Sequence, residues 1–347
     1  MLKKTTREIA RHWIKLSLSR NRSNSRLHSI TRAKTWNRSG ALEISFGWLF
    51  AIIAGVFIIF LAIYISSKLI NSEKEAISAE TGKEIGILLN PLETGFESSQ
   101  TTSITIPAET RIHNGCDDFS GNFGRQIIQL DQKNLGKWTK TDVNVFFNNK
   151  YIFSEEEIEG KKFYVFSKPF DFPFKVSDLF YMTSSNERYC FMNAPDEINN
   201  EILDLNQSNL ATDNCSSSDI TVCFDSDKCD INIDYNSGIV EKNGESVYFA
   251  GTREDSRALM YAAIFSNKDV YECQVKRLMM RLKEISLLYW DKEILNANKG
   301  CGGNLGDDLT ELSDMASSFS ISEEIGVMKM KVDIIDQKNN GAVCMLW

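Results

Sequence analysis

The pattern of apolar and polar positions divides the chain into a long apolar segment near its N-terminus and a mixed region behind it. The segment from Ile44 to Ser67 contains no charged residue over its 24 positions. As an α-helix it would extend about 36 Å, at about 1.5 Å per residue, which is enough to cross the hydrocarbon core of a bilayer. We therefore expect a transmembrane helix over residues 41–70.

Helix-forming residues continue beyond this span. Apolar residues recur at roughly helical spacing from Leu69 to Ile85, and Pro91 then ends the pattern. The pattern predicts one helix of about fifty residues over Ala41–Asn90, apolar in its first half. Its second half, residues 71–90, is expected to form an amphipathic stalk.

Residues 91–347 alternate between short apolar runs and turn-forming residues, which is typical of an α+β domain. Most of these runs are expected to pair as antiparallel strands. Asn243-Gly244 supplies two positions that tolerate positive φ, so we expect a tight hairpin between Ile239 and Phe249. The other predicted strands are Ser103–Pro107, Gln126–Leu130, Val143–Asn148, Phe163–Phe166, Tyr189–Met192, Ile220–Phe224, Ile231–Tyr235, Ile325–Ile335 and Ala342–Trp347.

Two helices are predicted in the C-terminal third. Ser266 followed three residues later by Asp269 is a helix start signal, and apolar residues then repeat every three or four positions from Val275 to Tyr289. Gly302-Gly303 interrupts the chain, and a second, shorter helix is expected over Leu305–Ser318. The first of these helices should bury its apolar stripe on the predicted sheet.

Charge is distributed unequally on the two sides of the span. Residues 1–40 carry eleven basic residues and one acid, which leaves 28 basic and 46 acidic residues for the rest of the chain. Because positive loops stay in the cytoplasm, we expect a cytoplasmic basic leader over residues 1–40 and an extracellular domain over residues 91–347. A leader rich in Arg and Ser is also typical of a mitochondrial transit peptide, which is the alternative interpretation.

All eight cysteines lie after the span, and the even number indicates disulfides outside the cell. Eight cysteines permit 105 pairings, so the connectivity stays open. A zinc site is disfavoured because the sequence contains no C-x-x-C pair and one histidine, His113, after the span. The predicted disulfide cysteines are Cys116, Cys190, Cys215, Cys223, Cys229, Cys273, Cys301 and Cys344.

Residues that could carry chemistry are few. Asp225, Asp227 and Asp230 have spacings seen in calcium loops, but the Gly and the distal Glu of an EF-hand are missing, and a solvated acidic turn is the alternative. His113 lies near Asp117 and Asp118 in the sequence without a nucleophile motif, which indicates a structural role.

Other motifs point to modification or association. Asn206 and Asn214 begin glycosylation sequons, and a disulfide at Cys215 would block the second. The glycine-rich run Gly302–Gly306 lacks the Lys and Ser/Thr of a phosphate loop. We expect no cofactor, no enzymatic activity and no nucleic-acid partner.

Small residues recur every four positions inside the span. Gly47, Ala51 and Gly55 share one face of the predicted helix, where another helix or a second copy could approach closely. Membrane lipid is the other partner expected for this segment.

The basic leader ends in Arg38-Ser39-Gly40-Ala41 directly before the apolar helix. This arrangement resembles the leader and N-terminal helix of type IV pilins and archaellins. The resemblance implies cleavage beside Gly40 and Ala41, although Glu43 is not at the position of the glutamate found in many bacterial members. The apolar span, the run LMYAAIFSNKDVYECQVKRLMMRL and the closing CMLW also resemble an uncharacterised group of membrane proteins from small-genome archaea.

Two classes of function follow. The first is a non-catalytic, single-pass cell-surface protein, pilin-like or stalked, whose helix anchors and spaces a disulfide-bonded head. The alternative is an ectodomain that binds a small ligand or a cation, as a receptor or an ectoenzyme. A plain signal anchor with a helical stalk is the simplest form of the first class.

Overall fold

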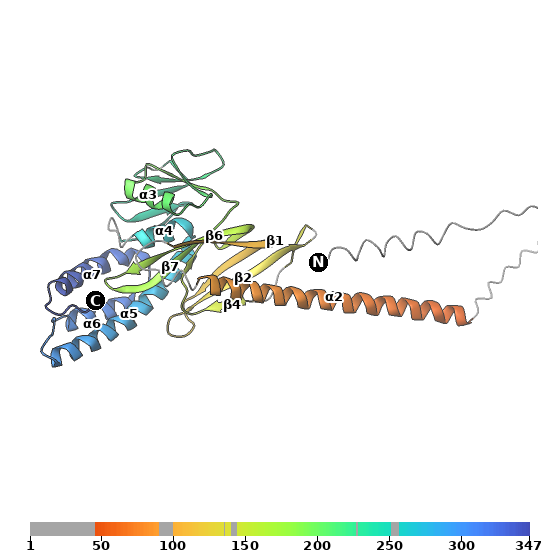
Figure 1. The fold of residues 1–347 in the computed structure, drawn as a ribbon, viewed down its shortest axis with the longest axis horizontal. Coiled ribbons are helices and arrows are strands. Elements are labelled where there is room, and N and C mark those ends of the chain that lie inside the picture. Colours follow the sequence, from red (N-terminus) through yellow and green to blue (C-terminus); the bar gives the residue numbers. More distant parts are fainter. Residues whose placement is uncertain (1–45, 90–99, 135, 140–143, 227, 251–256) are drawn as a thin grey trace, which may run out of the picture. The chain divides into compact units, whose positions relative to one another are not determined.

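A computed structural model describes residues 46–89, 100–134, 136–139, 144–226, 228–250 and 257–347, with the side chains of residues 70–89 left out. The first element is helix α2 (Phe46–Leu89), 44 residues long (Figure 1). The first 24 residues of this helix, Phe46–Leu69, form a candidate membrane span with a mean hydropathy of 2.8. The most apolar 18-residue stretch within it contains no buried residue. The predicted apolar helix and its continuation beyond the span are thus confirmed within the described residues.

We call the described residues from 100 to 347 the head; they contain a seven-stranded sheet, sheet A. Its long strands β1, β6 and β7 are antiparallel neighbours, and the order along the sheet is β3-β2-β1-β6-β7-β5, with β4 also paired to β2. The strands are β1 (Gln100–Asp117), β2 (Arg125–Asn134), β3 (Lys137–Thr139), β4 (Asn144–Phe147), β5 (Ile152–Phe153), β6 (Glu157–Asp171) and β7 (Lys175–Ser184).

A second, six-stranded sheet, sheet B, has the order β13-β12-β11-β10-β8-β9. Strands β8 and β9 are parallel neighbours, which need a crossover connection, and helix α3 (Asp196–Asp204) lies in that connection. The strands are β8 (Tyr189–Met192), β9 (Leu210–Thr212), β10 (Ile220–Phe224), β11 (Ile231–Asp234), β12 (Ile239–Lys242) and β13 (Glu245–Tyr248).

The head is α+β, as predicted, but its sheets are mixed. Strand β10 is parallel to both β8 and β11, and β5 is parallel to β7. The prediction of antiparallel strands alone is therefore wrong at these pairs. The hairpin is confirmed, because Asn243 and Gly244 have φ of 55° and 78° between β12 and β13.

The helical elements described after β13 are α4 (Arg257–Phe265), α5 (Lys268–Asn298), α6 (Gly306–Ser318), the 3-10 helix η3 (Ser322–Glu324) and α7 (Ile325–Asn340). Asn267, and not Ser266, caps α5, since its side chain accepts a hydrogen bond from the amide of Val270. The predicted short helix over Leu305–Ser318 is confirmed by α6.

The predicted strand Ile325–Ile335 is wrong, because this segment is helix α7. Apolar residues alternate along it in sequence, but they lie on two opposite faces of the helix. Met328, Val332 and Ile335 are buried, whereas Val327 and Met330 are exposed. The predicted strand Ala342–Trp347 also does not form.

Two hydrophobic clusters use alternate residues of the central strands of sheet A. Phe166 and Tyr181 belong to the larger cluster, which also contains the buried side chains of sheet B and helices α4 to α7. Val165 and Phe180 belong to the smaller cluster, built from β1, β2, β5, β6 and β7. Successive strand residues point to opposite faces, so β6 and β7 supply both clusters.

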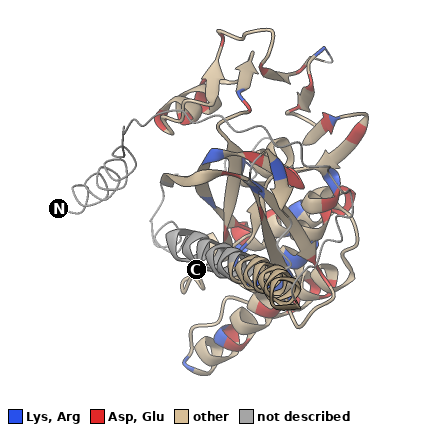
Figure 2. Ribbon diagram, turned by 90° about the vertical axis from the view of Figure 1, so that its right-hand side faces the viewer, with Lys and Arg blue, Asp and Glu red and all other residues tan. Residues whose placement is uncertain are grey.

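The eight cysteines form four disulfides in the structure. The pairs are Cys116–Cys273, Cys190–Cys215, Cys223–Cys229 and Cys301–Cys344, with Cα atoms 5.5 to 6.1 Å apart. The first joins β1 to α5 and the last joins the α5–α6 loop to the C-terminal segment. Acidic and basic residues are interspersed over the head (Figure 2).

Candidate functional site

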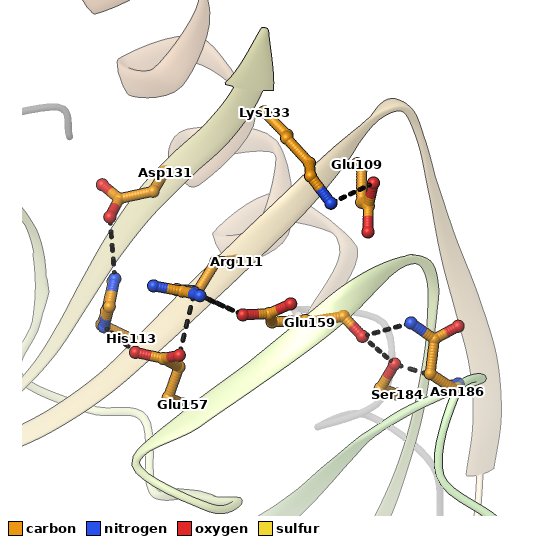
Figure 3. Close-up of polar contacts among 9 residues, drawn as sticks. All are labelled: Glu109, Arg111, His113, Asp131, Lys133, Glu157, Glu159, Ser184 and Asn186. Atoms are coloured by element: carbon orange, nitrogen blue, oxygen red, sulfur yellow. Dashed lines mark hydrogen bonds and ion pairs between the residues drawn. The ribbon is translucent and has the colours of Figure 1, made fainter. Parts of the chain in front are cut away.

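A group of charged residues on sheet A crosses strands β2, β1 and β6 (Figure 3). Residues 109, 111 and 113 of β1 alternate with Thr110 and Ile112, which are fully buried, so the charged positions share the opposite face. We call this group the charged ladder; it consists of Glu109, Arg111, His113, Asp131, Lys133, Glu157 and Glu159.

His113 contacts a carboxylate with each of its ring nitrogens. Its Nε2 lies 3.0 Å from Oδ2 of Asp131 on β2, and its Nδ1 lies 3.4 Å from Oε2 of Glu157 on β6. Asp131 is 1% exposed, whereas the His113 side chain is 29% exposed. A neutral imidazole has one N–H and serves one of these carboxylates, whereas an imidazolium serves both.

The neighbours of His113 in the sequence have other partners. Asp118 pairs with Lys276 of α5 at 2.6 Å, and Asp117 pairs with Arg125 at 3.1 Å. Hydrogen bonds from Ser120 and from the amide of Phe119 lower the pKa of Asp117. Residues four apart along a strand are about 13 Å apart, whereas cross-strand neighbours are about 5 Å apart, so the register decides what His113 contacts.

Arg111 continues the ladder toward β6. Its Nε lies 2.8 Å from Glu157 and 2.7 Å from Glu159, and its guanidinium lies 4.4 Å from the centre of the Trp138 ring. Lys133 pairs with Glu109 at 3.2 Å. Asp131, His113, Glu157, Arg111 and Glu159 thus form one connected group across three strands, and Lys133–Glu109 is a separate pair on the same face.

The ladder lacks the arrangement needed for acyl transfer. Ser184, the nearest hydroxyl drawn in Figure 3, donates to the carbonyl oxygen of Glu159 and accepts a bond of 3.1 Å from the amide of Asn186. Both nitrogens of His113 already face carboxylates, so neither is directed at this hydroxyl. Among the described residues no group of three or more His, Cys, Asp or Glu is placed to hold a metal ion.

The predicted calcium residues lie at the turn between β10 and β11. Asp230 accepts hydrogen bonds from the amide and hydroxyl of Thr221, at 2.8 and 2.7 Å, and these bonds lower the pKa of its carboxyl. Asp225 has a φ of 54° and lines an open groove of about 480 Å³ with Asp234 and Glu241. Asp227 lies outside the described residues, so the calcium hypothesis stays a prediction.

Both sequons are hydrogen-bonded into the fold. Asn206 is exposed with a φ of 49°, and the hydroxyl of Ser208 lies 2.5 Å from the hydroxyl of Tyr164. Asn214 is exposed, but its sequon contains Cys215, which is bonded to Cys190, and Ser216 donates to Asp219 at 2.7 Å. Bonds from the amide and hydroxyl of Ser216 lower the pKa of Asp219.

The remaining predicted sites lie in or before the span. Gly40 and Ala41, the predicted processing residues, lie outside the described residues. Gly47, Ala51 and Gly55 fall within α2, and a Cβ built at either glycine meets no atom within 4 Å. Whether another helix occupies that space stays a prediction.

Sequence reasoning missed a buried arginine on α5. Arg277 is fully buried and donates to the carbonyl oxygens of Phe123, Lys150 and Asn148 at 3.0, 3.0 and 3.2 Å. Its guanidinium lies 4.7 Å from the centre of the Tyr151 ring, and burial lowers its pKa to about 10. No local sequence signal separates this residue from the solvated arginines of other helices.

A second missed group joins the two sheets. Lys242 of β12 pairs with Glu155, and its Nζ lies 3.3 Å from the carbonyl oxygen of Ile264 at the end of α4. Burial raises the pKa of the nearby Glu187, the negative charge of Glu155 raises it further, and Lys242 acts in the opposite direction.

Comparison with protein-family models, with curated proteins and with solved structures finds no match for the chain.

Proposed function

We propose that the protein is a non-catalytic, single-pass subunit of the cell surface whose long helix anchors and spaces a disulfide-bonded head. The observation that carries this proposal is the continuity of α2. The helix runs without interruption from the apolar stretch Phe46–Leu69 to Leu89, so about 20 residues, or about 30 Å, extend past the span. A plain signal anchor does not require that extension.

The head supports the proposal through its disulfides. Each of the eight cysteines is paired, and the pairs join strands, helices and loops of both sheets. Such bonds persist in oxidising compartments, which agrees with export of the region after the span. The basic leader favours a cytoplasmic N-terminus, and cleavage beside Gly40 would make the subunit pilin-like.

The charged ladder fits a structural role in this subunit. Its basic residues are paired with its acids, and exposed ion pairs of this kind contribute little free energy each, about 0 to 1 kcal/mol. A second candidate function, cation or ligand binding by the head, is favoured by the open groove beside Asp225, Asp234 and Glu241. Calcium titration of the purified full chain, followed by its melting temperature, separates the two.

Topology is the decisive test. A tag after Trp347 should be digested when protease is added to intact cells, and a tag before Met1 should be digested only after lysis. The matched control replaces the basic residues between Arg26 and Arg38 with acids, which should weaken the orientation bias. Protection of the C-terminal tag in intact cells would contradict an extracellular head.

Processing is tested separately by mass spectrometry of the native N-terminus. A mature chain that begins at Ala41 or Leu42 supports the pilin-like form, and Gly40→Leu should then block cleavage. An intact N-terminus contradicts this form and leaves the stalked signal anchor.

A further inference from the structure

Asn206, the first residue of the sequon Asn206-Gln207-Ser208, lies in the turn that follows α3. Its backbone amide donates to the carbonyl oxygen of Leu203 at 3.1 Å, and its φ of 49° is a left-handed conformation that asparagine tolerates after a helix. The residue is exposed. A sugar attached to its amide nitrogen therefore has room outside the packed head.

The two residues that follow Asn206 are held against sheet A. Gln207 is buried, and its side-chain amide donates to the hydroxyl of Thr101 at 2.7 Å. The hydroxyl of Ser208 lies 2.5 Å from the hydroxyl of Tyr164. The transferase accepts only Ser or Thr at this third position, so it must recognise that hydroxyl. In the folded head the hydroxyl is already bonded, and the sequon is open to the enzyme only before this part of the chain folds.

The folded position of this sequon depends on parts of the chain that are made later. Leu205, next to Asn206, packs in the larger hydrophobic cluster together with α4 and α5. These helices begin at Arg257 and Lys268, so they are synthesised after the sequon. At about 5 to 20 residues per second, the ribosome reaches Arg257 roughly 3 to 10 s after Asn206. The transferase can modify Asn206 during that interval.

The second sequon, Asn214-Cys215-Ser216, does not depend on later residues. Cys215 is bonded to Cys190 of β8, which is synthesised 25 residues earlier and is present when Cys215 emerges. This bond ties the middle residue of the sequon to a strand. In the folded head the hydroxyl of Ser216 also donates to Asp219 at 2.7 Å. A local covalent bond thus withdraws the second sequon from the enzyme.

We propose that Asn206 carries an N-linked oligosaccharide, attached before the head folds, and that the Cys190–Cys215 bond keeps Asn214 unmodified. Glycosylation of Asn206 rests on the export of the head that the proposed function requires, because sequons are modified in exported domains. The donor is an oligosaccharide joined through phosphate to a membrane lipid. The amide nitrogen of Asn206 forms a bond to the anomeric carbon of the sugar and gives up a proton. The bond from that carbon to the phosphate oxygen breaks, and the lipid phosphate leaves with the electron pair.

The test is translation of the full chain with membrane vesicles that contain the transferase and its donor, under oxidising conditions. Glycans are counted as bands of lower mobility that an endoglycosidase removes. The unmodified chain and Asn214→Gln should each carry one glycan, and Asn206→Gln should carry none. A glycan that persists in Asn206→Gln and disappears in Asn214→Gln would assign the sugar to the other sequon and overturn the proposal.

The role of the disulfide is tested by two cysteine variants. Cys190→Ala leaves the second sequon intact and frees Cys215, so this variant should carry two glycans. Cys301→Ala, which opens the Cys301–Cys344 bond instead, is the matched control and should carry one. Two glycans on the unmodified chain, or a single glycan on Cys190→Ala, would contradict protection of Asn214 by the disulfide.

A flexible tag with its own sequon, placed after Trp347, separates failure at Asn206 from failure of export. A glycan on the tag with none on Asn206 overturns the glycosylation proposal and leaves the exported head in place. A tag that also stays unmodified shows that the head does not reach the transferase, which contradicts the proposed function and the glycosylation proposal together.

Timing is measured on the full chain purified in detergent from cells that lack the transferase. The folded, disulfide-bonded chain should accept no glycan from added transferase and donor, whereas the reduced and unfolded chain should accept one at Asn206 and one at Asn214. Circular dichroism and thiol counting establish which state is present. A glycan on Asn206 of the folded chain would contradict attachment before folding.

Discussion

Two glycines of the turn between β1 and β2 give a controlled test of how tightly α5 is fitted to this turn. Gly121 and Gly124 both have positive φ, of 70° and 58°. An added Cβ at Gly121 meets nothing within 4 Å. At Gly124 it would lie 2.4 Å from the carbonyl oxygen of Asp117 and 2.9 Å from Cγ of the buried Arg277.

The difference between the two alanine substitutions measures this packing. Gly121→Ala should cost about 1 to 2 kcal/mol, the penalty of a left-handed backbone for a residue with a Cβ. Gly124→Ala has the same penalty and must also displace backbone or Arg277, which adds about 1 to 3 kcal/mol, as in other overpacked sites. Because 1 kcal/mol changes the melting temperature by about 2 to 4 °C in a domain of this size, Gly124→Ala should melt about 2 to 12 °C below Gly121→Ala.

The assay is thermal unfolding of the full chain in detergent, followed by near-ultraviolet circular dichroism under non-reducing conditions. Because both variants change glycine to alanine in the same turn, effects on the unfolded chain cancel. Equal melting temperatures would refute the reasoning, since they would show that the β1–β2 turn moves away from Arg277 without cost.

Three further predictions follow from the buried charges and the disulfides. Glu187→Gln should stabilise the head at neutral pH and have no effect in strong acid. Burial and the charge of Glu155 raise the pKa of Glu187 in the folded protein. The native protein therefore loses stability as the pH rises above the pKa of Glu187 in the unfolded chain, because the buried carboxyl must then ionise. Denaturation at several pH values checks this, and a gain that is independent of pH would contradict it. Asp308→Asn should instead destabilise the head at neutral pH, because Lys331 and Lys338 outweigh burial and lower the pKa of Asp308. The stabilising contribution of Asp308 is present above the pKa that this residue has in the unfolded chain. It is lost as the pH falls through the pKa of Asp308 in the folded protein. Removing Cys116–Cys273 by paired alanine substitution should cost about 5 kcal/mol, and removing Cys223–Cys229 about 2 kcal/mol. The cost grows with the sequence separation of the bonded residues, which is 157 in the first pair and 6 in the second. Chemical denaturation should show the larger loss in the free energy of unfolding for the first pair, and a reversed order would contradict the chain-entropy account.

Local patterns predicted much of the fold. Strands β8 and β10 have the predicted bounds, and the Asn243-Gly244 hairpin forms as expected, because each depends on adjacent residues alone. Helix α7 was mistaken for a strand because apolar residues for its two faces alternate in sequence. The parallel pairing in sheet B depends on which strand α3 returns to, and short-range patterns do not contain that information.

The candidate site was harder to predict than the fold. His113 was identified as an isolated titratable residue, but its partners Asp131 and Glu157 are 18 and 44 positions away and become neighbours through the register of β1 with β2 and β6. Arg277 was missed for the same reason, since its acceptors Phe123, Asn148 and Lys150 are carbonyl oxygens of distant loops. Every residue has a backbone carbonyl oxygen, so the residue types in a sequence do not show which carbonyls will accept hydrogen bonds from a buried arginine.

The bond between Cys116 and Cys273 has a consequence for biosynthesis. At about 5 to 20 residues per second, a ribosome makes Cys273 roughly 8 to 30 s after Cys116. Four other cysteines are synthesised during that interval: Cys190, Cys215, Cys223 and Cys229. Each of them becomes available to Cys116 before Cys273, the native partner of Cys116, has been made. If the chain is oxidised while it is being made, Cys116 can therefore form non-native bonds first, and these must be exchanged after Cys273 appears.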